Sequence, residues 1–218
     1  MSQDLWRNVD AYIDEKLVGA DSALEAALDA NSAGGLPAID VSPSQGKLLY
    51  LLAKMNGSRR VLEIGTLGGY SAIWLARALP KDGRLVTLER DPKHAEVARA
   101  NLARAGLADM AEVQTGDALD LLPKLKGPFD FFFIDAHKDD YPHHVQWALK
   151  LARPGSVMVF DNVIRDGKVI DAKTSDASVR GVRRLNEMIK AEPRVSATAV
   201  QTVGVKGYDG FTVAVVTG

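Results

Sequence analysis

The sequence has no cysteine in its 218 residues, which excludes disulfides, thiolate nucleophiles and cysteine-ligated zinc or iron–sulfur sites. It also lacks an apolar run of about 18 residues, the length that a membrane-spanning helix needs. The formal net charge is only −1, so no global basic field attracts nucleic acid. The N-terminal segment MSQDLWRNVDAYIDEK carries charges every few residues, unlike a signal peptide. These absences predict a cytoplasmic protein that binds neither membranes nor nucleic acid.

Helical and strand patterns alternate along the rest of the chain. Helices are predicted at 3–18, 21–31, 43–55, 70–79, 92–106, 117–125, 142–153 and 176–191. Strands are predicted at 59–64, 84–89, 111–115, 129–134 and 155–160, and the alternating segments 195–203 and 210–217 predict a hairpin. This order predicts an α/β fold: a doubly wound, Rossmann-like, mostly parallel seven-stranded sheet with a C-terminal antiparallel hairpin and extra N-terminal helices. We expect one domain, with helices in 1–56 capping a site on the core at 57–218.

An acidic residue lies at or just beyond the end of each predicted parallel strand. These residues are Glu63, Glu89, Asp117, Asp135 and Asp161. Ligands of doubly wound sheets bind beyond the carboxyl ends of the strands, where these side chains meet. One such residue is most simply a helix cap. Five at one edge repel one another unless a cation or hydrogen-bond donors are present, so together they indicate a ligand site.

The segment EIGTLGGYS (63–71) is a glycine turn between a strand and a helix, a position that suits an anionic or polar ligand. Its glycines at 65, 68 and 69 do not match the dinucleotide pattern G-x-G-x-x-G. Glu89, at the end of the next strand, is placed to accept both hydroxyls of a ribose. A nicotinamide-dependent oxidoreductase therefore stays open as an alternative, as does a non-catalytic cofactor-binding protein on the same fold.

Several motifs carry a family resemblance. They are VSPSQGKLL, VLEIGTLGGYSAIWLA, FIDAHKDDY and ARPGSVMVFDNV. They resemble the cation-dependent O-methyltransferases that use S-adenosylmethionine, the group of catechol and caffeoyl-CoA O-methyltransferases, and the overall pattern is closer to the caffeoyl-CoA-like branch and its bacterial relatives. The similarity covers nearly the whole chain. It implies methyl transfer to a hydroxyl group of a catechol-like small molecule, and a homodimer, since the family commonly forms dimers.

The resemblance also implies which residues contact the cofactor. Those implied to hold its methionine part are Val41, Glu63, Gly65, Thr66 and Ser71. Glu89 would accept the ribose hydroxyls, and Asp135 would approach the charged end of the cofactor. Those implied to border the adenine are Asp117 and the backbone of Ala118.

Asp135, Asp161 and Asn162 are implied to bind a divalent cation. Their oxygen ligands favour Mg²⁺, with Ca²⁺ or Mn²⁺ as alternatives. A phenol has a pKa near about 10, so it is a poor nucleophile at neutral pH. Two vicinal hydroxyls can chelate the cation, which stabilises the phenolate and orients it. Lys138 would lie beside the reacting oxygen, either as a base or as an electrostatic stabiliser, so that Lys138 and Asp135 form the implied catalytic pair.

Two segments depart from the caffeoyl-CoA pattern. Ile164 and Arg165 follow the Asp-Asn pair where that branch usually has a tryptophan, and VGVKGYDGF (203–211) is predicted to be a longer turn than usual. Both border the substrate mouth in the family, so an acyl-CoA substrate is not expected and a smaller phenol is. The remaining candidates for metal ligands are three histidines, which we expect at the surface: His137, His143 and His144.

Overall fold

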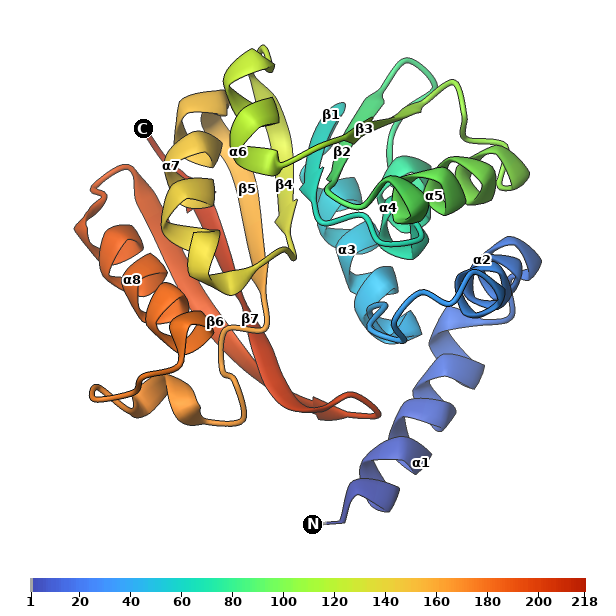
Figure 1. Ribbon diagram of the computed structural model, residues 1–218, viewed down its shortest axis with the longest axis horizontal. Helices are drawn as coiled ribbons and strands as arrows, with labels where there is room; N and C mark the ends of the chain where they lie inside the picture. Colours follow the sequence, from blue (N-terminus) through green and yellow to red (C-terminus); the bar gives the residue numbers. More distant parts are fainter. Residues whose placement is uncertain (1) are drawn as a thin grey trace.

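The computed structural model describes residues 2–218 as a twisted sheet with helices on both faces (Figure 1). The strands are β1 (Arg60–Ile64), β2 (Arg84–Glu89), β3 (Ala111–Thr115), β4 (Phe129–Ile134), β5 (Ala152–Asp161), β6 (Val195–Gly204) and β7 (Gly207–Val216). Their order is β3-β2-β1-β4-β5-β7-β6. Strands β1 to β5 are parallel to one another, while β7 runs antiparallel between β5 and β6. The predicted fold class is confirmed.

Four of the longer helices begin at an aspartate or serine that caps them. The α-helices are α1 (Gln3–Ile13), α2 (Ser22–Ala33), α3 (Pro43–Met55), α4 (Tyr70–Ala78), α5 (Pro92–Arg104), α6 (Ala118–Leu121), α7 (Tyr141–Leu151) and α8 (Ala177–Ala191). Short helices are η1 (Asp14–Val18), η2 (Leu122–Lys124), η3 (Lys138–Asp140) and η4 (Lys168–Ile170). Asp21, Ser42, Asp91 and Asp176 each accept a backbone N–H at the start of the helix that follows. No helix among residues 2–218 has the length and apolar character needed to cross a membrane.

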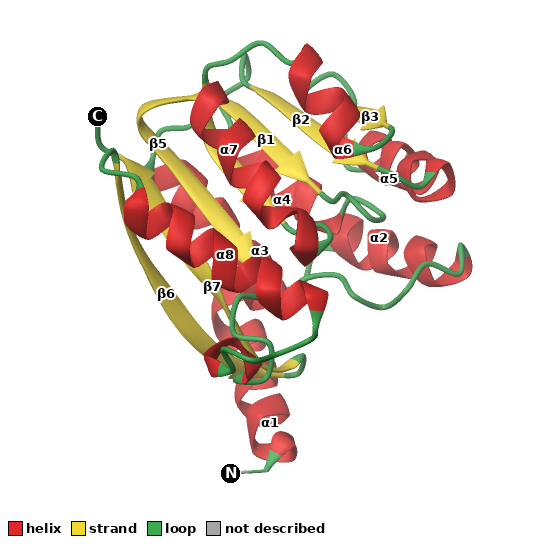
Figure 2. Ribbon diagram, turned by 60° about the vertical axis from the view of Figure 1, so that its left-hand side comes forward, coloured by secondary structure: helices red, strands yellow, loops and turns green. Residues whose placement is uncertain are grey.

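Strand β4 explains why the run FDFFFI is so apolar. All of its residues are buried. Phe131 and Phe133 point into a core shared with α3, α4 and α5, whereas Phe132 and Ile134 point into the core under α7 and α8. Figure 2 shows these two helical layers on opposite faces of the sheet. Because both faces are covered, the strand has no side on which a polar residue would reach water.

Three predicted elements differ from the observed ones by more than small shifts at their ends, apart from the hairpin described below. Strand β5 begins at Ala152 rather than at 155, because Ala152 pairs with Phe129 before a register shift that takes up Pro154 and Gly155. The helix predicted at 117–125 changes to the tighter η2 at Leu122, where Pro123 cannot donate an α-helical hydrogen bond. The helix predicted at 3–18 ends as α1 at Ile13 and continues as the wider η1.

The prediction of a long turn over 203–211 was wrong, although the hairpin itself is confirmed. Gly204 pairs with Gly207, so only Val205 and Lys206 form the turn. Residues 207–211 belong to β7 and continue the ladder with β6. The sequence was misleading because its glycines suggest a loop, whereas here they allow a tight turn and a close approach of α1: a Cβ on Gly204 would lie 2.5 Å from Asp10 Oδ2.

Candidate active site

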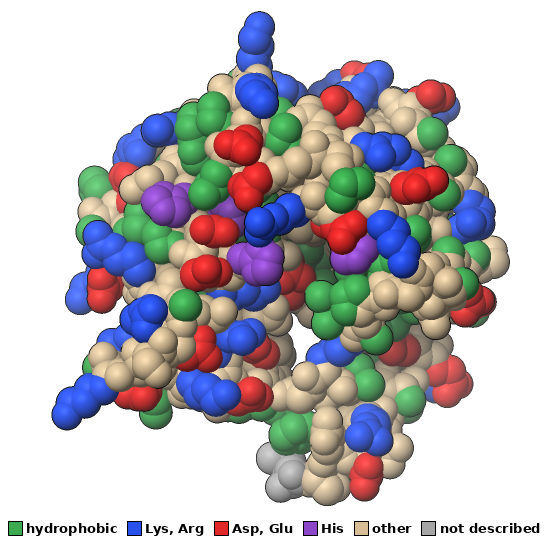
Figure 3. Space-filling model, in the orientation of Figure 1, with side chains coloured by type: hydrophobic (Ala, Val, Ile, Leu, Met, Phe, Trp, Pro, Cys, Tyr) green, Lys and Arg blue, Asp and Glu red, His purple; other side chains and the backbone are tan. Residues whose placement is uncertain are grey.

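A cavity of about 840 Å³ opens at the carboxyl ends of β1, β2 and β4, as expected for this sheet type. Figure 3 shows acidic, basic and histidine side chains gathered around a depression on this face. Most of the predicted site residues line the cavity: Val41, Gly65, Thr66, Ser71, Glu89, Asp117, Ala118, Asp135, Lys138 and Asn162. The two that do not are Glu63, which is wholly buried, and Asp161, which lines a second cavity of about 340 Å³.

Gly65 joins the end of β1 to the end of β4. Its φ is +97°, and a Cβ at this position would lie 2.1 Å from the carbonyl oxygen of Asp135. The Asp135 N–H in turn donates to the carbonyl of Ile64 at 2.9 Å. Only glycine allows so close an approach, so the turn fixes where Asp135 leaves the sheet.

Glu89 holds the glycine turn over the end of β2. One carboxylate oxygen accepts the backbone N–H groups of Thr66 at 3.2 Å and Leu67 at 2.7 Å, and the other accepts that of Asp91 at 2.9 Å. The side chain is only 10% exposed and lines the cavity. Its carboxylate is therefore fixed in place and keeps free lone pairs that face the cavity, as a ligand with paired hydroxyls requires.

Glu63 lies one layer behind the cavity wall. It accepts hydrogen bonds from the hydroxyls of Ser71 and Thr87, both at 2.6 Å, and the Thr87 hydroxyl also bonds that of Thr66. Burial raises the pKa of Glu63 to about 8 despite these two hydrogen bonds, and the charges of Asp135 and Glu89 add to the rise. The carboxyl group is thus protonated at neutral pH unless a positive charge enters beside it.

The predicted metal ligands follow two adjacent strands, β4 and β5. Asp161 is 5% exposed, and its carboxylate accepts from Gln45 Nε2 and from the N–H of Asn162, both at 2.8 Å. Burial raises the pKa of Asp161, and the charge of Asp135 raises it further. Asn162 has a left-handed φ of +53° and lines both cavities, so it stands where they meet.

The donor chemistry of this group fits a hard divalent cation. The carboxylates of Asp135 and Asp161, next to an amide oxygen, supply only oxygen ligands, and the charge of Asp135 disfavours the ionisation of Asp161 while no cation is bound. Among residues 2–218, no three carboxylate, histidine or cysteine side chains are grouped as a metal ion would need, and the predicted trio contains only two. Lys138 Nζ lies 2.6 Å from Asp135 Oδ1, so an ammonium already faces one of the carboxylates.

Tyr141 fixes the spacing between β4 and β5 at the site. It is fully buried, and its hydroxyl lies 3.0 Å from the carbonyl of Ile134 and 2.7 Å from that of Asp161. Close packing of α8 supports the same loop, since a Cβ on Gly181 would lie 2.1 Å from the Lys138 carbonyl oxygen. The Tyr141 hydroxyl thus contacts the backbone of Ile134, which precedes the predicted metal ligand Asp135, and the backbone of Asp161, which is itself a predicted ligand.

The surface prediction for the histidines was correct for His137 and His143 and wrong for His144. His144 is 2% exposed, lines the cavity wall, and its Nδ1 has no hydrogen-bond partner among residues 2–218. Burial lowers the pKa of His144 to about 4, so the ring is neutral. The signal was present in the sequence, because His144 follows Tyr141 by three residues and shares its inward helix face.

Arg165, which lies in a segment expected to border the substrate mouth, lines the cavity. Other cavity residues were missed: Ile39, Asp40 and Ser178 line the cavity with the predicted set, and Gln45 binds Asp161 from α3. They come from loops and helices far apart in the sequence, and no local motif connects them.

This sheet order, with an antiparallel β7 inserted beside β5 and a cavity over the glycine turn, defines a class I methyltransferase. The O-methyltransferase family profile matches residues 20–215. The chain therefore belongs to the O-methyltransferase family.

Relatives and solved structures agree with this assignment. The chain is 57% identical to a catechol O-methyltransferase of Mycobacterium tuberculosis, over 96% of this chain and 95% of that protein. It is 52% identical to a catechol O-methyltransferase of Niastella koreensis, over 99% and 100% of the two chains. An O-methyltransferase from Bacillus cereus, solved in complex with SAH, matches with a TM-score of 0.98 and 56% identity over 99% and 100%. The oxidoreductase and non-catalytic alternatives are set aside.

Proposed function

We propose that this enzyme transfers the methyl group of S-adenosylmethionine to a hydroxyl of a vicinal diphenol, with a divalent cation at Asp135, Asp161 and Asn162. One observation carries the proposal: Lys138 and the paired carboxylates of Asp135 and Asp161 meet at the ends of β4 and β5, beside the cavity over the glycine turn. The names of the two catechol O-methyltransferase relatives and the SAH-bound structure support it.

The chain's residues divide the work between two ends of the cavity. Glu89 would accept the ribose hydroxyls, while Gly65 and Ser71 border the space for the methionine part. When bound, the cofactor supplies the methyl group on its sulfonium, and the cation lowers the pKa of a chelated hydroxyl. Asp135 lies between the two ends and would orient both reactants.

Lys138 would lie next to the reacting oxygen. Its side chain is 12% exposed and is held by Asp135 at 2.6 Å, so the ammonium has little freedom to move away. It would either accept the proton of the hydroxyl or stabilise the oxyanion as it forms.

The test is methyl transfer to a vicinal diphenol, with excess EDTA and then with added Mg²⁺. We expect EDTA to abolish turnover, Mg²⁺ to restore it, and a monophenol to react poorly because it cannot chelate. Asp161→Asn should lose both turnover and calorimetric Mg²⁺ binding, while Asp29→Asn, on the exposed face of α2, should lose neither. If protein that elemental analysis shows to be metal-free turns over at the full rate, the proposed requirement for a cation is wrong. The enzyme would then be a metal-independent O-methyltransferase.

We also propose a homodimer formed through α1 and the β6–β7 hairpin, which lie side by side (Figure 1). Apolar side chains are exposed on both: Leu5, Val9, Tyr12, Val200, Val203 and Val205. Several exposed apolar side chains on two neighbouring elements are typical of an interface. Light scattering should give twice the chain mass of 23.5 kDa, and a single species at that mass would refute the dimer. A cytoplasmic location stays a prediction.

A further inference from the structure

Arg165 stands in the loop after β5, at the departure from the caffeoyl-CoA pattern noted in the sequence. It lines the main cavity together with Ile39, Lys138, Asn162 and Ser178. Its φ is +56°, in the left-handed region that few residues other than glycine adopt. Such a backbone persists only when its surroundings hold it.

Asp209 on β7 is what holds this backbone. One oxygen of its carboxylate accepts the N–H groups of Ile164 at 2.9 Å, Arg165 at 3.0 Å and Gly210 at 2.9 Å. Three hydrogen bonds to one carboxylate oxygen fix the loop against the sheet. The direction in which the Arg165 side chain leaves the backbone is therefore set by the fold.

The guanidinium of Arg165 has a donor that nothing in the protein satisfies. Its Nε is buried without a hydrogen-bond partner among residues 2–218, and within that range Arg165 forms no ion pair. Because Arg165 lines the cavity and has no carboxylate partner among residues 2–218, its guanidinium is available to an anionic ligand atom there, which would offset part of the cost of holding an unpaired charge in the cavity wall.

We propose that Arg165 selects the acceptor by binding an anionic substituent, such as a carboxylate, on the ring of the diphenol. The inference rests on the proposed function, because the cation at Asp135, Asp161 and Asn162 would fix the two hydroxyls. The rest of the ring then extends toward Ile39 and Arg165 in the main cavity. Dihydroxyphenyl carboxylates are the substrate class, in preference to neutral or cationic catechols.

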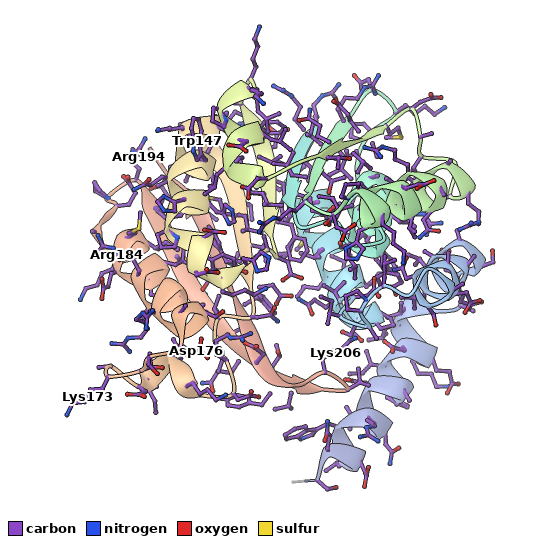
Figure 4. The ribbon with its side chains drawn as sticks, in the orientation of Figure 1. Trp147, Lys173, Asp176, Arg184, Arg194 and Lys206 are labelled. Carbon is purple, nitrogen blue, oxygen red and sulfur yellow. The ribbon has the colours of Figure 1, made fainter. Side chains whose placement is uncertain are left out.

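The second cavity is the wrong place for such a substituent. Its charged lining is mostly acidic: Asp10, Asp161, Asp166 and Asp209 against Lys206. Lys206, labelled at the hairpin tip in Figure 4, donates to the carbonyl of Ala38 at 3.2 Å. A carboxylate placed there would meet like charges. In the main cavity such a substituent could meet the guanidinium of Arg165, whereas Lys206 in the second cavity already donates to a backbone carbonyl.

The experiment compares kcat/KM for dihydroxybenzoate, unsubstituted catechol and dihydroxyphenethylamine. Arg165→Gln should lower kcat/KM for dihydroxybenzoate by about 10- to 100-fold, the usual loss when a charge-assisted hydrogen bond is removed, and leave catechol unchanged. Arg165→Lys should recover part of the loss, because it keeps the charge but not the planar fork. Arg184→Gln is the matched control: this arginine lies on the outer side of α8, paired with Glu187 (Figure 4).

Three outcomes would overturn the proposal. An equal loss on all three acceptors would make Arg165 structural, and a weakened calorimetric affinity for SAM would assign it to the cofactor. A change of acceptor preference in Lys206→Gln, with none in Arg165→Gln, would place the ring in the second cavity. If the unmodified enzyme methylates no diphenol, the proposed function fails. The role of Arg165 is then tested separately by comparing the calorimetric affinity for dihydroxybenzoate of the unmodified protein with that of Arg165→Gln.

Discussion

Replacing Glu63 by glutamine should change how the stability of the protein depends on pH. The carboxyl group is fully buried, with a pKa near 8 set first by burial. A glutamine keeps its shape: the Oε1 atom can accept from Ser71, and Nε2 can donate to the Thr87 hydroxyl, which then donates to Thr66. One amide N–H stays without a partner and costs about 1–3 kcal/mol, equally at every pH.

The sign of the pH effect follows from proton binding. Between an ordinary glutamic acid pKa of 4.5 and about 8, the folded protein keeps the Glu63 proton and the unfolded chain loses it. Stability therefore falls as the pH rises through this window, by at most about 1.4 kcal/mol per pH unit. The total has an upper bound of about 5 kcal/mol.

The assay is urea unfolding of the cofactor-free and metal-free protein at a series of pH values. The difference in unfolding free energy between Glu63→Gln and the unmodified protein should grow in favour of the variant from about pH 5 to about pH 8. The other ionisable groups are the same in both proteins, so their contributions largely cancel. Glu112 is an exposed residue of β3, so Glu112→Gln should show no such trend. Parallel curves for Glu63→Gln and the unmodified protein would refute the argument that burial keeps Glu63 protonated.

A second readout uses the proposed cofactor. If a cationic group of SAM or SAH enters beside Glu63, binding at neutral pH ionises the carboxyl group and releases a proton. The calorimetric binding enthalpy should then depend on the ionisation enthalpy of the buffer in the unmodified protein and lose that dependence in Glu63→Gln. Buffer dependence that survives the substitution would assign the proton to another group.

Three further predictions concern Asp130, at the end of β4 away from the site, and two residues of the site, Tyr141 and Lys138. Burial raises the pKa of Asp130, but the N–H groups of Arg59 and Arg60 and the ion pair with Arg153 outweigh it and hold the pKa below the usual range. In urea unfolding at neutral pH, Asp130→Asn should therefore be less stable than the unmodified protein by about 2–3 kcal/mol. This difference in unfolding free energy should vanish as the pH falls through the pKa of Asp130. Tyr141→Phe should weaken calorimetric Mg²⁺ binding more than SAH binding, and equal effects on both would contradict its spacing role. Lys138→Met should lose turnover in either role, whereas Lys138→Arg should retain it if the residue stabilises an oxyanion and lose it if the residue accepts the proton.

The fold was predictable because its signals are local and periodic. The run FDFFFI is apolar on both faces because helices cover both sides of β4, and Asp91-Pro92 starts a helix through a cap and a fixed φ. The error at 203–211 came from glycines, which serve tight turns and loops alike. Here only pairing with the neighbouring strand decides between the two, and that pairing is not written in the local sequence.

The site was predictable where it lies at strand ends and not where helices and loops complete it. Glu89 and Asp135 follow from their strands, because parallel strands bring their carboxyl ends to one edge. Gln45 reaches Asp161 across 116 positions of sequence, and that contact depends on how α3 packs. Glu63 was expected to contact the cofactor, but strand alternation alone does not reveal that Ser71 and Thr87 enclose it behind the wall.

The two ends of the cavity are built differently, and this has a consequence for specificity. Glu63, Gly65 and Glu89 are tied to strands and to a turn that tolerates no side chain, so substitutions there disturb the core. Arg165 belongs to a loop whose backbone is fixed by the Asp209 carboxylate rather than by its own side chain. A change at Arg165 can therefore alter which acceptor is bound while the fold and the cofactor end stay intact. Substrate preference in this enzyme should respond to single substitutions after β5 without a matching loss of stability.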